Sequence, residues 1–499
     1  MGFHKATSLG SSLKHKISDL SWERGCVNFF NESVPFSFTN GQEYASLCAD
    51  IISVWAKQNQ VSPSILEFGS GLGVFSQHCI AELKKRGCKT HFTLSDRPPA
   101  TVEQLTKQFQ KDNVDVKCVD ITRSFKDINP HVMLCNYVFD TLPVKCLEFK
   151  GGVLYEWKLS SFIKEGSEIK DTTVLPFETW GKDAIEKQLL SSFPLEKLPL
   201  LSRIHPCIKH TWSKHVCQPQ DIDPTGFLGR FLASHSDQDI LFNFSPLIFE
   251  SLHNMVKSSA ENKLLIMHDL AQISLAQFQK KEHCYSEFGS CVCYSVPFFL
   301  IQFFCEENNL YFTHSKHPDS ENQIALLSSL PLDNDDIQNI LSGSEPGKAI
   351  GDAAIAVKDA SSYEELIALL DTHKSFFNEK QLSDYVYCFN AAQSLMNVEN
   401  FEEALLYIEK ISSVYKEMGA NASIIESKCY RKLGMQDKAL DVLNQTLKDI
   451  QNYDLLWLEK AFAESEKNNI RSCINSIKKY FKYVTYNPQF NLESLIKEI

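Results

Sequence analysis

The stretch SILEFGSGLG at residues 64–73 decides the fold. Ser64 to Phe68 is a short apolar run that predicts a buried strand, and Val74 to Arg86 has apolar positions at helical spacing with a basic end. The glycines between them let the backbone turn tightly and approach a bound nucleoside, while the first helical turn offers free N–H groups. The sequence therefore predicts a strand–turn–helix unit with a nucleotide-type pocket at its turn.

Similar units follow along the chain. We expect strands at 91–94, 114–119 and 132–135, a helix through 104–109, and further sheet-like runs at 263–267, 291–304 and 310–314. Strands that alternate with helices are typical of a parallel sheet covered by helices, a Rossmann-like α/β fold. The run LEFKGGVLYEW at 147–157 has two adjacent glycines between alternating segments and predicts a hairpin.

The glycine spacing separates two kinds of nucleotide site. A dinucleotide fingerprint needs a third glycine at position 74, where this chain has Val74. The Gly-x-Gly-x-Gly spacing preceded by an acid instead resembles motif I of class I S-adenosylmethionine-dependent methyltransferases. Tight strand-to-helix turns also occur for purely structural reasons, so the neighbouring positions matter.

Acidic and amide residues follow the next three predicted strands, in the order that the resemblance implies. Asp96 comes after the second strand, where these enzymes hold the ribose hydroxyls, and Asp120 comes after the third, where an acid contacts the adenine amine. Asn136 ends the fourth strand, beside the methyl group. The resemblance thus implies S-adenosylmethionine as the cofactor, with this set of binding residues: Glu67, Gly69, Gly71, Gly73, Asp96 and Asp120.

A narrower resemblance surrounds Asn136. The run NYVFDTLP at 136–143 and the hairpin after it resemble the Asn-Glu-x-x-Asp-Ala-Leu-Pro motif of the MidA family, which includes the mitochondrial complex I assembly methyltransferase. The runs FTNGQE at 38–43 and LLIMHD at 264–269 resemble that family's segments before the first strand and at a late strand. The resemblance implies that Asn136 and Asp140 face the methyl acceptor, although Asp140 is equally well explained as a helix N-cap ahead of Pro143.

One departure from the family concerns the acceptor. Family members that modify arginine are thought to use the acid after the asparagine, and here that residue is Tyr137. A guanidinium has a pKa above about 12, so its methylation calls for carboxylates that orient it and accept a proton. Asp140, Glu148 or Asp269 meets this need only if the fold brings it to the pocket, which makes arginine a doubtful acceptor.

The chain divides into segments of different composition. We expect a helical lead-in over 1–60, the methyltransferase domain over 61–330 with a mostly helical insertion at about 160–260, a polar linker over 331–350, and helical repeats over 351–499. In the last segment Ala404 and Ala439 lie 35 residues apart, and Cys473 follows 34 residues later. This period is typical of tetratricopeptide repeats, and a plain helical bundle is the alternative.

Composition narrows the function classes. The 499 residues carry a net charge of −12, which argues against nucleic acid as the main partner. The 16 cysteines include no Cys-x-x-Cys pair, and the histidines at 205, 210 and 215 do not share a helical face, so we expect reduced thiols, no metal site and a cytoplasmic protein. No run approaches the length of a signal peptide or a membrane span.

These observations support two functions from different classes. The first is a methyltransferase that acts on a protein substrate recruited by the C-terminal repeats. The second is a catalytically silent S-adenosylmethionine-binding scaffold, or a tetratricopeptide-type interaction or assembly protein. Methylation of a small molecule is a third interpretation.

Overall fold

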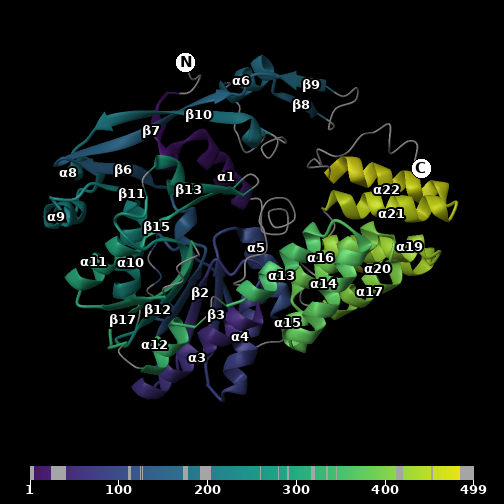
Figure 1. Ribbon diagram of the computed structural model, residues 1–499, viewed down its shortest axis with the longest axis horizontal. Coiled ribbons are helices and arrows are strands. Elements are labelled where there is room, and N and C mark those ends of the chain that lie inside the picture. Colours follow the sequence, from purple (N-terminus) through teal and green to yellow (C-terminus); the bar gives the residue numbers. More distant parts are fainter. Residues whose placement is uncertain are drawn as a thin grey trace.

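The computed structural model describes residues 5–23, 41–110, 114–123, 125, 127–171, 178–190, 204–258, 260–278, 280–288, 291–315, 321–332, 335–343, 346–411, 420–450 and 453–483. Figure 1 shows an α/β part with two large sheets, and beside it a block of helices from the last third of the chain, green to yellow. The first three of the residues at 38–43 that resemble the MidA segment lie outside the described residues.

The central sheet carries the candidate site. Its strand order is β16-β17-β12-β5-β2-β3-β4, with the short β15 also paired to β12. Strands β2, β3, β4, β5 and β12 run parallel, whereas β17 pairs antiparallel with β12 and β16 antiparallel with β17. Numbered along the chain, the five parallel strands have the doubly wound order 3-2-1-4-5, whose direction of winding reverses between β2 and β5. The strand bounds are Ser64–Phe68 (β2), His91–Asp96 (β3), Val114–Cys118 (β4), Val132–Asn136 (β5), Leu264–Gln272 (β12), Val296–Pro297 (β15), Tyr311–His314 (β16) and Asn322–Ser328 (β17).

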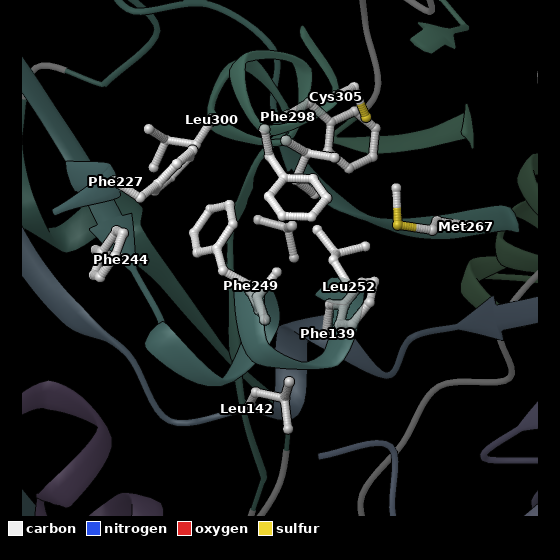
Figure 2. Close-up of a cluster of buried hydrophobic side chains, with 14 of the residues drawn as sticks. Phe139, Leu142, Phe227, Phe244, Phe249, Leu252, Met267, Phe298, Leu300 and Cys305 are labelled. Carbon is white, nitrogen blue, oxygen red and sulfur yellow. The ribbon is translucent and has the colours of Figure 1, made fainter. Parts of the chain in front are cut away.

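Alternate residues of each strand face two separate cores. On β5, Val132 and Leu134 pack with α3 (Gln42–Asn59), α4 (Val74–Lys85) and α5 (Pro99–Gln108). Met133 and Cys135 face the other core, with α9 (Phe227–Ser234), α10 (Pro246–Ser258) and α11 (Phe298–Glu307). Figure 2 shows part of this second core, which is rich in phenylalanine. The sheet is thus buried on both faces, as a parallel sheet requires.

The predicted hairpin is confirmed. Strands β6 (Lys145–Lys150) and β7 (Val153–Ile163) join at Gly151 and Gly152, whose φ angles of 57° and 76° suit a type I′ turn. They form a second, antiparallel sheet with three other strands: β1 (Thr7–Ser8), β10 (Ile208–Val216) and β11 (Ile240–Phe244).

The prediction of a mostly helical segment at about 160–260 misses its strands, because β10 and β11 complete this antiparallel sheet. Burial alternates only in the first half of β10, where Ile208, His210 and Trp212 are the less exposed residues, and its last three residues are exposed, so the sequence shows no clear strand pattern. The segment also holds the paired β8 (Glu168–Asp171) and β9 (Glu178–Gly181), with helices α6 (Lys182–Leu190) and α8 (Pro219–Ile222) besides α9 and α10. The sheet-like run predicted at 291–304 is strand only at its start: β14 (Cys291–Tyr294) pairs with β13 (Tyr285–Phe288), and α11 follows.

The predicted lead-in and the predicted linker each contain a helix that packs on the α/β part of the molecule. Helix α1 (Leu13–Glu23) packs on β14, and the Nζ of its buried Lys14 lies 2.5 Å from a carboxylate oxygen of Glu287. The expected polar linker over 331–350 is wrong, because α12 (Asp335–Leu341) buries apolar side chains in the core beside α3. Its Asp- and Asn-rich exposed face conceals those positions in the sequence.

The C-terminal helices form successive hairpins. The bounds are Lys348–Asp359 (α13), Tyr363–Phe376 (α14), Glu379–Leu382 (α15), Tyr385–Asn397 (α16), Phe401–Lys410 (α17), Ala420–Lys432 (α19), Gln436–Asp449 (α20), Asp454–Glu466 (α21) and Ile470–Tyr483 (α22). Ala404, Ala439 and Cys473 are buried at corresponding places in α17, α20 and α22, each the second helix of a pair. Among the described residues, no helix combines the length and apolar character needed to cross a bilayer.

Candidate functional site

The glycine-rich loop lies between β2 and α4, at the carboxyl end of the sheet. Its three glycines have left-handed φ angles of 64° at Gly69, 55° at Gly71 and 72° at Gly73. A Cβ atom at Gly73 would lie 2.6 Å from the Phe109 ring and 2.9 Å from Leu105, and one at Gly69 would lie 2.8 Å from Val138. Glycine is therefore required here by conformation and by close packing.

The acid before the loop is enclosed. Glu67 is 2% exposed, and its carboxylate accepts a short hydrogen bond from the Ser76 hydroxyl in the first turn of α4. Ser95 Oγ donates to the Glu67 carbonyl oxygen at 2.6 Å, linking β3 to the end of β2. Burial raises the pKa of Glu67 to about 7. The side chain thus fixes the start of α4 and is poised between its charged and neutral forms near neutral pH.

Asp96 contacts the loop directly. One carboxylate oxygen accepts from the Gly71 N–H at 2.9 Å and the other from the Arg97 N–H at 2.7 Å. Burial raises the pKa of Asp96, although both backbone hydrogen bonds oppose this. The structure therefore brings the end of β3 to the middle of the glycine loop. A contact between Asp96 and a ribose stays a prediction.

Asp120 follows β4 and has local partners. One carboxylate oxygen accepts from the backbone N–H and the hydroxyl of Thr122, at 2.9 and 2.7 Å, and the other lies 3.7 Å from Nε of Arg123. These contacts are those of a turn-forming aspartate. A contact with an adenine group stays a prediction for this residue.

Asn136 is held by a residue that the motifs did not single out. The Tyr44 hydroxyl of α3 donates to Asn136 Oδ1 at 2.7 Å, which directs the amide Nδ2 the other way. That nitrogen is buried and has no hydrogen-bond partner among the residues that the structure describes. A buried donor without a partner costs about 1–3 kcal/mol, so this atom is suited to donate a hydrogen bond to a bound ligand.

Aromatic side chains surround this asparagine. The His268 ring lies 5.0 Å from that of Tyr44 and 5.2 Å from that of Tyr137, centroid to centroid. Tyr137 has a left-handed φ of 52°, and its N–H donates to the His268 carbonyl at 2.8 Å. Asn136 and His268 are partners in the β5–β12 register, and the only sequence signal for this pairing is that each ends an apolar run.

Two of the three candidate acids come together. Asp269 accepts from the Asp140 and Phe139 N–H groups, and the carboxyl groups of Asp140 and Asp269 share a hydrogen bond; they are 1% and 0% exposed. Asp140 lies inside a 3₁₀ turn, Phe139–Thr141, and not at its N-cap, so the capping alternative is wrong. Contact between Asp140 and an acceptor stays a prediction.

Glu148 does not join them. It accepts from the Trp157 indole at 2.7 Å and pairs with Lys214 at 3.0 Å on the antiparallel sheet. In the part of the chain that the structure describes, no cluster of three or more His, Cys, Asp or Glu side chains could hold a metal ion.

The buried acid pair leads to a prediction about stability. Burial raises the pKa of both carboxyls, so the folded chain holds a proton at pH values where an unfolded aspartate, with a pKa of about 4, has lost it. The resulting stability is complete below about pH 4 and is lost as pH rises through the raised pKa. In the Asp140→Asn variant the side-chain amide can donate a hydrogen bond to Asp269, and this amide does not titrate.

Urea unfolding should therefore show Asp140→Asn about 1–3 kcal/mol more stable than wild type near pH 8, with little difference near pH 5. Asp371→Asn, at an exposed carboxyl, is the matched control and should show no such pH dependence. Equal loss of stability at both pH values by Asp140→Asn would show that the pair does not share a titrating proton.

Comparison with known proteins gives matches to solved structures only. No protein-family model matches the chain, and no curated protein matches it. Two crystal structures of a protein from Burkholderia thailandensis, one provisionally described as a methyl transferase and bound to S-adenosylhomocysteine, are 10% identical; the match covers 63% of this chain and 93% of theirs, with a TM-score of 0.39. The plantazolicin methyltransferase BpumL in complex with S-adenosylhomocysteine is 12% identical over 63% of this chain and 98% of its own, with a TM-score of 0.28.

Proposed function

We propose that this chain is an S-adenosylmethionine-dependent methyltransferase that acts on a protein recruited by its C-terminal helices. The observation that carries the proposal is the glycine loop at the point where the sheet reverses its winding, with the Asp96 carboxylate against the Gly71 N–H. In open α/β sheets ligands bind in the crevice at this point, and the helix after the loop offers free N–H groups.

The residues fit such a cofactor. The three glycines would hold it at the loop, and Asp96 and Asp120 would hold its ribose and adenine. Glu67, enclosed and bonded to Ser76, would act by fixing the loop and the start of α4. S-adenosylmethionine supplies a methyl group already activated on a sulfonium, so the protein's task is to orient the acceptor and exclude water. Asn136, whose Nδ2 lacks a partner within the described ranges, is the residue suited to orient the acceptor.

The acceptor we favour is a group other than arginine. Tyr137 occupies the position of the family acid, and two of the candidate carboxyls, Asp140 and Asp269, are enclosed and hydrogen-bonded to each other. Deprotonation of a guanidinium needs an available carboxylate. The C-terminal hairpins, with small residues at the period of tetratricopeptide repeats, favour a polypeptide substrate, because such arrays expose extended concave surfaces.

The second candidate is a silent scaffold that binds S-adenosylmethionine without transferring its methyl group. Tyr137, with its left-handed backbone beside Asn136, favours this candidate. Incubation of the full chain with methyl-labelled S-adenosylmethionine and cell lysate separates the two: labelled protein supports the enzyme, and cofactor binding with no labelled product supports the scaffold.

Asp96 gives the most specific binding prediction. Asp96→Ala is expected to weaken the binding of both S-adenosylmethionine and S-adenosylhomocysteine by about 1.5–3 kcal/mol, the range for a hydrogen bond to a charged group. Calorimetric titration measures this effect, and Asp115→Ala on the neighbouring β4, with an exposed side chain, is the control. Unchanged affinity in Asp96→Ala would place the cofactor elsewhere.

A further inference from the structure

The glycine loop packs against the C-terminal helices. Leu72, inside the loop, is 6% exposed and Val74, the first residue of α4, is 2% exposed. Both belong to the same apolar core as Ile350 and Ala353 of α13, and not to the cores on the two faces of the sheet. The apolar side of the loop is therefore buried by helices that lie about 280 residues further along the chain.

A single carboxylate joins the same two parts of the molecule. Glu43, in the first turn of α3, accepts from the Gly347 N–H at 2.7 Å and from the Gln381 side-chain amide at 2.7 Å. Gly347 is the N-cap of α13, where a negative charge is favourable because of the free N–H groups and the helix dipole. Gln381 lies on α15. One side chain thus holds two helices of the C-terminal block.

The residue after Glu43 reaches the candidate site. Tyr44 donates to Asn136 at 2.7 Å, and its ring lies 5.4 Å from that of Phe75 near the start of α4. The first turn of α3 therefore contacts the C-terminal helices through Glu43. Through Tyr44 it contacts Asn136 and the helix after the glycine loop. Figure 1 shows α13 next to the α4 and α5 side of the sheet.

We propose that Glu43 is a positioning residue that seats the C-terminal helices on the glycine loop, so that cofactor affinity depends on this seating. The inference rests on the proposed function and extends it: the helices belong to the cofactor-binding unit besides recruiting a substrate. Because coupling between two sites is reciprocal, a polypeptide that binds the helices and shifts α13 changes cofactor affinity, and bound cofactor changes affinity for that polypeptide.

The test compares point variants of the full chain. Glu43→Ala removes both hydrogen bonds, Gln381→Ala removes one from the helical side, and Glu43→Gln keeps an acceptor for Gly347. The control is Glu307→Ala, which removes two hydrogen bonds from Arg230 between α9 and α11, far from the loop in the chain. Titration with S-adenosylhomocysteine gives the dissociation constants. Hydrogen exchange of the backbone N–H groups of residues 69–76, measured without ligand, reports how readily the loop opens.

Glu43→Ala is expected to weaken S-adenosylhomocysteine by about five- to thirty-fold and to speed exchange at 69–76, with smaller effects in Gln381→Ala and partial rescue in Glu43→Gln. Glu307→Ala should change neither. The inference is overturned if wild type binds and Glu43→Ala binds equally well with unchanged exchange, or if Glu307→Ala has the same effects. No binding by wild type overturns the proposed function together with this inference.

Discussion

Gly73→Val is expected to abolish binding of S-adenosylhomocysteine and to destabilise the fold by about 2–5 kcal/mol. A left-handed φ of 72° costs a side-chain-bearing residue about 1–2 kcal/mol. The new Cβ would also lie 2.6 Å from Phe109 and 2.9 Å from Leu105, and overpacking of this kind costs about 1–3 kcal/mol. Relief of the contacts requires the loop to move away from α5, which displaces the N–H groups proposed to hold the cofactor.

Gly87→Val is the matched control for this prediction. Gly87 follows α4 with a left-handed φ of 68°, and a Cβ there would meet no atom of the described residues within 4 Å. Its replacement should cost only the backbone strain and leave ligand affinity unchanged. Urea unfolding and calorimetric titration of both variants separate strain from packing; equal losses in the two variants would mean that the close contacts at Gly73 are unimportant.

The second large effect concerns where the chain can be cut. A chain ending at residue 330 lacks α12 and with it three buried side chains: Leu332, Ile337 and Leu341. Each contributes about 1.5–3 kcal/mol when buried, and the sum approaches the whole stability of a typical domain. We therefore expect the 1–330 fragment to be unfolded or insoluble, against the domain boundary that the sequence predicts.

A chain ending at Gly343 keeps α12 and is the matched comparison. It should unfold cooperatively in urea, but it exposes Leu72 and Val74 and so should bind S-adenosylhomocysteine more weakly than the full chain. Circular dichroism and titration of the two fragments measure these differences. A folded 1–330 fragment would show that α12 is dispensable.

Local patterns in the sequence predict the part of the fold that carries the site. The apolar run at 64–68, the glycines after it and the helical spacing from Val74 act over a few residues, and the strand and helix occur where these patterns place them. The positions of Asp96 and Asn136 at strand ends follow from the same alternation. Such features depend on interactions between residues that are close in the sequence and on the parallel arrangement of the strands.

The contacts that the sequence does not predict join distant segments. The bonds from Tyr44 to Asn136 and between Asp140 and Asp269 depend on the packing of α3 and on the β5–β12 register. The sequence does not reveal helix α12, because the exposed face of this helix is as polar as a linker. The glycine loop is buried under α13, although the composition of the sequence assigns the two to different segments. No local pattern in the sequence indicates this contact.

The most direct test of the central claim is calorimetric titration of the full chain with S-adenosylhomocysteine, repeated with NADH. Because Val74 replaces the third glycine of a dinucleotide site and the Asp96 carboxylate lies against the loop, we expect one molecule of S-adenosylhomocysteine to bind per chain and NADH not to bind. Binding of NADH without S-adenosylhomocysteine would contradict the account.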